Sequence, residues 1–293
     1  MAVQTMKLLT DAEVQRFPRA TAVEVMRRAV LAAEHGELTS PARLHAADMT
    51  FTVGGMPDVF GFRAYHTRNT PLDEQVVVVW ANSGCVAGVV VGTELGPLRT
   101  SAIGVLATQA LARPEASQLG LIGSGMQARH HALTLSSVRE LTQVLVYSRQ
   151  TESREKLAAE LRVAGLPAQA APSAEEVCAA SDLLTLATNS SRPVIQPEWV
   201  RPGTHVCTLG PKEAHRHEFP PELARRAALV VTDSLNQLQG YPGSHALAAE
   251  DTTSLGACLQ SGSIRQPDDI TLFLSVGLAG TEVLLAQAIL QKR

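Results

Sequence analysis

The segment that most constrains the fold lies near the middle of the chain, where a short apolar run ends in a glycine-rich loop. Residues 118–122 (QLGLI) are followed by residues 123–128 (GSGMQA), a Gly-x-Gly-x-x-Ala pattern. In a dinucleotide site, the first glycine allows a tight turn out of a strand, and the second lets the backbone approach the pyrophosphate. A small third residue lets helix and strand pack closely. The loop therefore predicts a dinucleotide phosphate site, with these candidate contacts: Gly123, Gly125, Met126, Gln127 and Ala128.

The glycine pattern alone does not identify a dinucleotide site, because a chain with 21 glycines contains glycine pairs by chance. The segments on either side of the loop must therefore be considered. Residues 129–138 can continue a helix, and residues 142–147 (TQVLVY) have the β-branched, apolar character of a second strand. Strand, glycine turn, helix and strand within about 30 residues form the βαβ unit that the motif requires. The alternative is an ordinary turn between a strand and a helix.

The end of the second strand indicates which dinucleotide is bound. NAD sites usually place an Asp or Glu there to accept a hydrogen bond from the ribose 2′-OH. Here Ser148, Arg149 and Thr151 occupy the position, and the first carboxylate is Glu152. A guanidinium can donate two parallel hydrogen bonds to a 2′-phosphate. The sequence therefore predicts a preference for NADP(H), with NAD(H) as the alternative cofactor and a solvated loop arginine as the alternative role of Arg149.

Length and composition are those of a globular protein with room for two domains. The chain has 293 residues, of which 45% are hydrophobic and 18% charged, and its net charge is −3. This balance favours neither nucleic acid nor a membrane as a partner. The four cysteines are widely spaced and form no CxxC pair, which predicts reduced thiols in a cytoplasmic protein. No secretory signal is expected, because Asp11 and Glu13 lie where an apolar run would be needed.

An uncharged stretch from Val76 to Thr93 approaches the length of a membrane span. Asn82, Ser83 and Gly84 interrupt it, with a β-branched run on either side. Such a pattern predicts a buried β-hairpin and not a transmembrane helix.

The remaining patterns predict a mixed α and β region followed by a regular α/β region. A capping box at residues 10–13 opens a short helix. Before the glycine loop we expect, in addition to the hairpin, helices over 21–34 and 99–112 and strands near 43–47 and 59–66. After residue 150 we expect helices over 152–163 and 174–180 and strands over 182–187, 205–209 and 228–232. This alternation predicts a doubly wound parallel sheet.

Together these segments resemble the ornithine cyclodeaminase/mu-crystallin family, from about residue 43 to the C-terminus. The likeness rests on residues 55–57 (GMP), 60–63 (FGFR), 98–100 (LRT), 123–128 (GSGMQA), 202–205 (PGTH) and 273–277 (FLSVG). It implies an α/β protein with a central Rossmann-type domain over residues 116–278. It also implies an α+β substrate and dimerisation domain over residues 1–115 and 279–293, and a homodimer. Members of the family include cyclodeaminases, imine reductases and amino-acid dehydrogenases.

The resemblance also implies roles for particular residues. The substrate carboxylate contacts of the family fall on Arg43, Arg63 and Arg99, and a planar guanidinium suits this role because it binds a carboxylate with two hydrogen bonds. A surface ion pair is the alternative for Arg43. Thr100 falls near the cofactor phosphates. The expected lining of the nicotinamide site is Ser275, Val276 and Gly277.

Two candidate catalytic residues, Arg63 and Lys212, depart from the pattern of the family. Arg63 stands where the family usually has lysine, and a guanidinium cannot exchange protons near neutral pH. Lys212 aligns with an aspartate that handles protons in cyclodeaminases, unless Glu213 is the true counterpart. A lysine replaces a carboxylate base only if burial strongly lowers its pKa.

These departures favour an imine reductase over a cyclodeaminase. Arg63, Arg99 and Lys212 would repel the distal ammonium of ornithine. The sequence therefore predicts NAD(P)H-dependent reduction of a C=N bond beside a carboxylate, in a cyclic ketimine acid or an imino acid. Ornithine cyclodeaminase proper and a weakly catalytic, NADPH-dependent binding protein are the alternatives. The proton donor is left open among Lys212, His45, Tyr65 and water, and no metal site is expected.

Overall fold

The computed structural model describes residues 6–67, 74–240, 245–247, 249–262 and 265–292. The chain divides into two compact units, here called unit 1 (Met1–Arg99 with Gly277–Arg293) and unit 2 (Thr100–Val276). The first division lies inside a helix, earlier in the chain than the boundary after residue 115 that the sequence suggests. The second division lies between residues 276 and 277, whereas the sequence suggests a boundary between residues 278 and 279.

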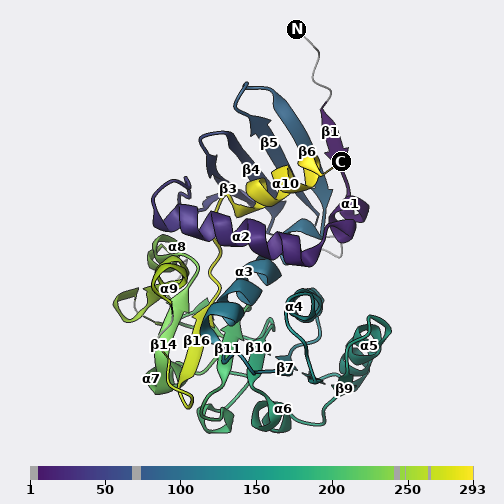
Figure 1. Ribbon diagram of the computed structural model, residues 1–293, viewed down its shortest axis with the longest axis vertical. Helices are drawn as coiled ribbons and strands as arrows, with labels where there is room; N and C mark the ends of the chain where they lie inside the picture. Colours follow the sequence, from purple (N-terminus) through teal and green to yellow (C-terminus); the bar gives the residue numbers. More distant parts are fainter. Residues whose placement is uncertain (1–5, 68–73, 241–244, 248, 263–264, 293) are drawn as a thin grey trace. The chain divides into compact units, whose positions relative to one another are not determined.

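Unit 1 is built on a six-stranded sheet in the order β1-β6-β5-β4-β3-β2 (Figure 1). Strand β1 is parallel to β6, and the other neighbours are antiparallel. The strands are β1 (Lys7–Leu9), β2 (Leu44–Ala46), β3 (Met49–Met56), β4 (Val59–His66), β5 (Gln75–Ala81) and β6 (Val86–Gly92). The predicted hairpin is confirmed as β5 and β6, although alternate side chains along these strands are only half-buried.

The helices of unit 1 are α1 (Asp11–Arg16), α2 (Arg19–Glu34), α10 (Thr281–Gln291) and the first turn of α3 (Leu95–Leu111). The predicted capping box is present at α1, where the Thr10 backbone N–H donates to Glu13 Oε2 over 2.9 Å. Helix α10 packs on one face of the sheet, because Gly61 and Gly88 leave room there for Val283 and Leu290. The helix expected at 99–112 begins four residues earlier, at Leu95.

Strand β3 was not predicted, because its glycines normally weaken a strand. In the structure they are needed for close backbone packing. A Cβ atom on Gly54 would lie 2.4 Å from the Thr39 carbonyl oxygen and 2.7 Å from Gly280 Cα. Gly55 has φ +157° and a similarly crowded Cβ position.

Unit 2 contains an eight-stranded, wholly parallel sheet in the order β15-β14-β16-β11-β10-β7-β8-β9 (Figure 1). Its strands are β7 (Gln118–Ile122), β8 (Gln143–Tyr147), β9 (Ala168–Ala170), β10 (Leu183–Leu186), β11 (His205–Thr208), β14 (Ala227–Thr232), β15 (Thr253–Ser254) and β16 (Ile270–Leu274). The chain moves outward from β7 through β8 to β9, and then returns to β10 on the other side of β7. This reversal is a topological switch point, where ligands bind at the carboxyl ends of the strands.

Helices cover both faces of this sheet, so the predicted doubly wound α/β fold is confirmed. Val206 of β11 packs in the same core cluster as Val177 of α6 (Ala174–Ala180). Its neighbour Cys207 points to the opposite face, beside Gly104 of α3. The other helices of unit 2 are α4 (Met126–Ser136), α5 (Thr151–Val163), α7 (Glu222–Arg226), α8 (Leu235–Gln239) and α9 (Leu255–Ser261), and a small hairpin is formed by β12 (Lys212–Glu213) and β13 (Arg216–His217).

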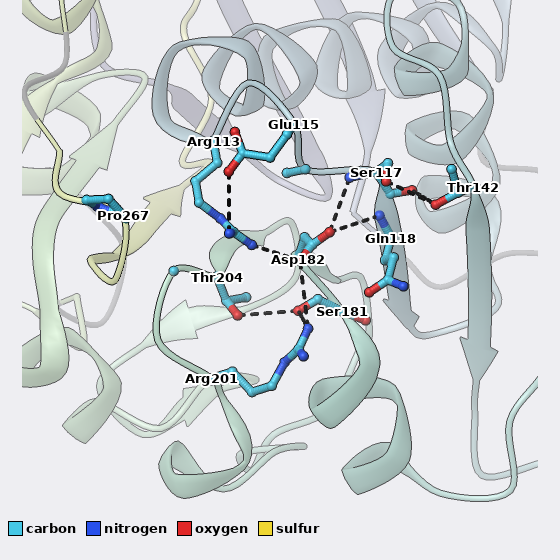
Figure 2. Close-up of polar contacts among 12 residues, drawn as sticks. Arg113, Glu115, Ser117, Gln118, Thr142, Ser181, Asp182, Arg201, Thr204 and Pro267 are labelled. Carbon is cyan, nitrogen blue, oxygen red and sulfur yellow. Dashed lines mark hydrogen bonds and ion pairs between the residues drawn. The ribbon is translucent and has the colours of Figure 1, made fainter.

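A carboxylate ties together the amino ends of β7 and β10, as Figure 2 shows. Asp182 Oδ1 accepts from Arg113 Nη2 over 2.9 Å, and Asp182 Oδ2 accepts from the backbone N–H groups of Ser117 and Gln118 over 3.2 and 3.4 Å. Arg201 adds an ion pair at 3.7 Å. This cluster is at the opposite end of the strands from the glycine loop, so it organises the sheet without blocking the carboxyl edge.

Within the described residues, the structure has no helix with both the length and the apolar character of a membrane span.

Candidate functional site

The glycine loop follows β7 at the carboxyl edge of the unit 2 sheet. Gly123 has φ +118°, and a Cβ atom there would lie 2.2 Å from the Ala187 carbonyl oxygen. Its N–H donates to the Tyr147 carbonyl over 2.8 Å, which joins the loop to the end of β8. A larger residue at position 123 would separate the loop from its neighbours, so glycine is required there.

Gly125 is the N-cap residue of α4 and has no side chain to cap the helix. A Cβ atom on Gly125 would have no heavy atom within 4 Å, so open space lies in front of the loop. The N–H groups of the first helical turn attract anions in such a position. These residues therefore fit a dinucleotide phosphate: a tight turn, an open approach and an uncapped helix N-terminus.

A cleft of about 1060 Å³ lies at this edge of the sheet. Gly123, Ser124 and Gly125 line it, together with Ser148 and Arg149 from the end of β8. Its other residues are Ile122, Tyr147, Gln150, Ser153, Ser173, Ala174, Glu175, Ala187, Thr188, Asn189, Ser190, Pro193, Val194 and Trp199. A volume of this size accommodates a dinucleotide.

The polar loop after β10 also lines the cleft and was not predicted from the sequence. Thr188, Asn189 and Ser190 line the cleft directly after the fully buried strand Leu183–Leu186. These residues could have been identified from the sequence, because polar residues that follow a buried parallel strand lie at the edge of the sheet where ligands bind.

The other predicted cofactor residues have different surroundings. Met126 is exposed and lines a smaller pocket beside the cleft, whereas Ala128 is completely buried and packs α4 against the sheet. Gln127 is half-buried, and its Oε1 has no hydrogen-bond partner. Thr151 is exposed at the start of α5. Neither Thr151 nor Thr100, which is half-buried in α3, is among the residues that line the cleft.

Ser275 and Val276 follow β16 and are fixed by a residue that the sequence analysis did not identify, Asp233. Asp233 Oδ1 accepts from the Val276 N–H over 2.8 Å, and Ser275 Oγ donates to Asp233 Oδ2 over 3.4 Å. The carboxylate thus sets the path of the chain just before Gly277, which begins the last segment of unit 1.

In unit 1, two predicted substrate-binding arginines meet on one carboxylate. Glu282 Oε1 accepts from Arg63 Nη1 over 2.8 Å and from Arg99 Nη2 over 2.5 Å. The Nε atoms of both arginines are buried and have no hydrogen-bond partner. Glu282 was also missed, although a single carboxylate within the apolar segment 281–286 (TEVLLA) is a visible signal.

The charges in this cluster do not cancel. Burial raises the pKa of Glu282, but the positive charges of Arg99 and Arg63 outweigh this effect and place its pKa at about 2. Glu282 is therefore an anion near neutral pH. Burial and the neighbouring charge of Arg99 lower the pKa of Arg63, while Glu282 opposes that shift. Two guanidinium groups against one carboxylate leave an excess positive charge that suits an anionic ligand.

The third predicted arginine lies close to the same cluster. A Cβ atom on Gly277 would lie 2.4 Å from Arg43 Nη2 and 3.7 Å from Arg99 Nη1, so both guanidinium groups approach this glycine. The Arg63 guanidinium also stacks 4.2 Å above the ring centre of Tyr65. The structure therefore gathers Arg43, Arg63 and Arg99 within unit 1.

Lys212 lies in unit 2, on β12, and is completely buried. Its Nζ donates to the Gly210 carbonyl oxygen over 2.6 Å. Glu213, the alternative counterpart of the family aspartate, is half-buried and its carboxylate lies 3.4 Å from His215 Nε2. A second acidic residue, Glu218, is fully buried and accepts from the Gly210 N–H, the Thr188 N–H and the Thr188 hydroxyl. No sequence pattern singles out Glu218.

Within the described parts of the chain, no three His, Cys, Asp or Glu side chains are grouped in a way that could hold a metal ion.

Comparison with known proteins gives a match over almost the whole chain. The model of the ornithine cyclodeaminase/mu-crystallin family matches residues 11–293. Ketimine reductase mu-crystallin of Mus musculus is 26% identical over 209 residues, which cover 71% of this chain and 66% of that protein. A Delta(1)-pyrroline-2-carboxylate reductase of Bacillus cereus is 28% identical over 212 residues, which cover 69% of this chain and 65% of that protein. The matched segments thus span slightly less than two thirds of these relatives' own length.

Solved structures share the fold along the full chain. A probable ornithine cyclodeaminase from Bordetella pertussis superposes with a TM-score of 0.85 and 28% identity, covering 97% of this chain and 96% of that one. An archaeal alanine dehydrogenase dimer with bound NAD gives a TM-score of 0.87 and 25% identity, covering 98% and 95%. A Thermococcus litoralis Delta(1)-pyrroline-2-carboxylate reductase with NADH and L-proline superposes with a TM-score of 0.83 and 24% identity. The superposition covers 98% of this chain and 97% of that one.

Proposed function

Because the chain belongs to the ornithine cyclodeaminase/mu-crystallin family, we propose that it is an NAD(P)H-dependent reductase of a C=N bond beside a carboxylate. Its substrate is a cyclic ketimine acid or an imino acid, and its product is the corresponding amino acid. The observation that carries the proposal is the buried pair Arg63 and Arg99 on the single carboxylate of Glu282, in a chain that also has a dinucleotide cleft. Relatives named as ketimine and pyrroline-2-carboxylate reductases support it.

The arginines of unit 1 bind the acid and orient it. A substrate carboxylate compensates the excess positive charge that Glu282 leaves, and the planar guanidinium of Arg99 fixes the plane of that carboxylate with two hydrogen bonds. Arg63 cannot take up or release a proton near neutral pH, so we assign it charge stabilisation and binding. Reduction needs a hydride at carbon, which the nicotinamide cofactor supplies when bound, and a proton at nitrogen.

The glycine loop and the end of β8 hold the cofactor. Gly123 and Gly125 admit the pyrophosphate, and the first turn of α4 donates to it. Ser148 and Arg149 line the same cleft, which contains no carboxylate at the end of β8. These residues favour a 2′-phosphate, so we propose that the protein prefers NADP(H) to NAD(H).

We further propose that the protein is a homodimer formed by unit 1. The sheet face opposite α10 carries a continuous apolar row in register across five strands, from Leu8 through Val89, Val78 and Phe62 to Val53. Phe60 and Trp80 stack beside this row with ring centres 5.9 Å apart. Exposed apolar surface of this extent marks an interface, and the archaeal alanine dehydrogenase is a dimer.

The proposed activity is tested by the oxidation of NADPH and NADH in the presence of candidate imines. Pyrroline-2-carboxylate and piperideine-2-carboxylate test cyclic ketimines, and keto acids mixed with ammonia test imino acids. We expect consumption of NADPH with at least one of these substrates and no release of ammonia from ornithine.

Other outcomes would contradict the proposal in distinct ways. Release of ammonia from ornithine, with no reduction of any imine, would identify a cyclodeaminase. Tight NADPH binding without turnover of any imine would identify a binding protein. The variant Arg99→Leu should abolish reduction while NADPH binding is retained, because Arg99 is not among the residues that line the cleft.

A further inference from the structure

Two buried, oppositely charged side chains hold the same residue at the carboxyl edge of the unit 2 sheet. Glu218 Oε1 accepts from the N–H of Gly210 over 2.5 Å, and Lys212 Nζ donates to the carbonyl oxygen of Gly210 over 2.6 Å. Both side chains are completely shielded from solvent. Gly210 follows β11, so this arrangement fixes the chain where it leaves that strand.

The other oxygen of Glu218 reaches the cofactor cleft. Glu218 Oε2 accepts from the Thr188 N–H over 2.7 Å and from the Thr188 hydroxyl over 2.8 Å. The Thr188 hydroxyl oxygen in turn accepts from the Ser190 N–H over 3.2 Å. The Glu218 carbonyl accepts from the Val194 N–H over 2.9 Å. Thr188, Ser190 and Val194 all line the cleft, so Glu218 holds the loop after β10 through both its carboxylate and its backbone carbonyl.

The packing around Gly210 leaves no room for adjustment. A Cβ atom on Gly210 would lie 2.3 Å from the Thr188 carbonyl oxygen and 2.4 Å from Glu218 Oε2. The loops after β10 and β11 therefore touch through this glycine. A change at either charged residue is transmitted directly to the wall of the cleft.

We propose that Lys212 and Glu218 are positioning residues that hold the cofactor cleft open in its binding shape, and that Lys212 acts through Glu218 and not as a proton donor. Lys212 supplies the counter-charge that keeps Glu218 ionised, and only an ionised Glu218 accepts all three hydrogen bonds from Gly210 and Thr188. This inference rests on the proposed cofactor site.

The electrostatic surroundings agree with this role. Burial raises the pKa of Glu218, while the positive charge of Lys212 is the largest effect opposing that rise. Cys207 lies near both charges, and burial raises the pKa of its thiol, so it stays neutral. Asp233 also lies near Cys207, and His245 lies near Lys212 with its pKa lowered to about 4, first by burial. Among the described groups, Lys212 is thus the largest influence that lowers the pKa of Glu218.

The test is the dissociation constant of NADPH as a function of pH, measured by titration calorimetry with the full-length protein. We expect Lys212→Met to weaken NADPH binding roughly ten-fold at neutral pH, because removal of one member of a buried pair leaves the other charge uncompensated. Without Lys212 the pKa of Glu218 is higher, so its carboxylate is protonated at a higher pH than in the wild type, and the affinity for NADPH should begin to fall at a higher pH. The double variant Lys212→Met/Glu218→Gln lacks both members of the pair, so it should lose this added dependence on pH and keep only that of the 2′-phosphate of NADPH and of the remaining titratable groups, His245 among them.

A catalytic lysine gives a different result. If Lys212→Met lowers kcat and leaves the NADPH dissociation constant unchanged at every pH, the positioning role is wrong. The same conclusion follows if the single and double variants show the same pH dependence. Should Lys212→Met not fold, Glu218→Gln decides the question: the affinity of the wild type for NADPH should fall more steeply at acidic pH than that of the variant, and parallel profiles would overturn the inference. If the wild-type protein binds neither NADPH nor NADH, the proposed function itself fails.

Discussion

Glu282 shows how one side chain sets the chemistry of a cluster of charges. Without it, Arg63 and Arg99 would be two like charges, both largely buried, in close contact. With it, both guanidinium groups are held and one positive charge remains for a ligand. The carboxylate therefore has two effects, since it stabilises the arginines and leaves them incompletely neutralised.

The shape of the Arg99 side chain is expected to matter as much as its charge. Arg99→Lys keeps the charge but loses the planar fork, so we expect KM for the imine to rise roughly ten-fold while the NADPH dissociation constant is unchanged. Steady-state kinetics and calorimetry measure the two quantities. The matched control is Arg16→Lys at an exposed arginine, which should change neither. An unchanged KM in Arg99→Lys would remove Arg99 from the substrate site.

Arg149 gives a second prediction for a single residue. Arg149→Asp replaces a donor to a 2′-phosphate by an anion that repels it, so NADPH binding should weaken roughly 100-fold and NADH binding should change little. Dissociation constants for both cofactors measure the effect. Arg28→Asp, at an exposed arginine of α2, is the control for a change in net charge. If the ratio of the two constants is unchanged in Arg149→Asp, a different residue recognises the 2′-phosphate.

Among the elements, β7 and β10 depend on a contact at the end away from the cleft. Asp182 accepts from Arg113 and from two backbone N–H groups at the start of β7 (Figure 2). We expect Asp182→Ala to lower the free energy of unfolding by about 2 kcal/mol, because three partly buried donors lose their acceptor. Urea denaturation measures this change. Glu198→Ala, at an exposed carboxylate of the same unit, should cost less than about 0.5 kcal/mol.

The elements also show what sequence patterns can and cannot predict. Periodicity and turn residues locate α2, α5 and α6 to within about two residues, because these features are local. Strand β3 escapes prediction because its glycines are explained by a distant neighbour, Gly280. Strand β1, with three residues, is defined by its partner β6 and not by its own composition.

The candidate site was predicted unevenly for the same reason. The glycine loop has a recognisable local pattern, and the arginines could be named through the resemblance to a known family. Glu218 is recognisable only through its hydrogen bonds to Thr188, which is 30 residues earlier in the chain. The burial of Lys212 likewise depends on packing that no local pattern encodes.

At the scale of the whole molecule, stability should depend on two buried histidines of unit 2. His131 lies against Gly104, and His205 Nδ1 is 2.9 Å from the Thr271 hydroxyl. Burial lowers the pKa of His131 to about 4, and burial followed by the charges of His131 and two arginines lowers that of His205 to about 3. In the unfolded chain both pKa values are about 6.5. The unfolded state therefore binds more protons below that pH, and stability falls as pH falls.

We expect the folded protein to lose about 2 kcal/mol per histidine between neutral pH and about pH 5. Urea denaturation at the two pH values measures the loss. His131→Gln lacks one titrating group, so its stability should decrease less between the same pH values than that of the wild type. Equal decreases would mean that His131 is not buried in its neutral form.

The assembly gives the last prediction. Phe60→Lys places a charge in the apolar face of the unit 1 sheet, so the proposed dimer should dissociate at concentrations where the wild type remains dimeric. Light scattering after size-exclusion chromatography measures the mass. Val163→Lys, at an exposed apolar residue of α5 in unit 2, is the control and should leave the mass unchanged. A monomeric wild type would overturn the proposal.

The two tryptophans of the chain are distributed so that each reports on one of these questions. Trp199 lines the cofactor cleft, and Trp80 stacks on Phe60 in the apolar face of the sheet. The tryptophan fluorescence of Trp80→Phe then comes from the cleft alone, and that of Trp199→Phe from the sheet alone. The chain thus contains two native optical probes, and ligand binding and subunit association can be observed separately without an attached dye.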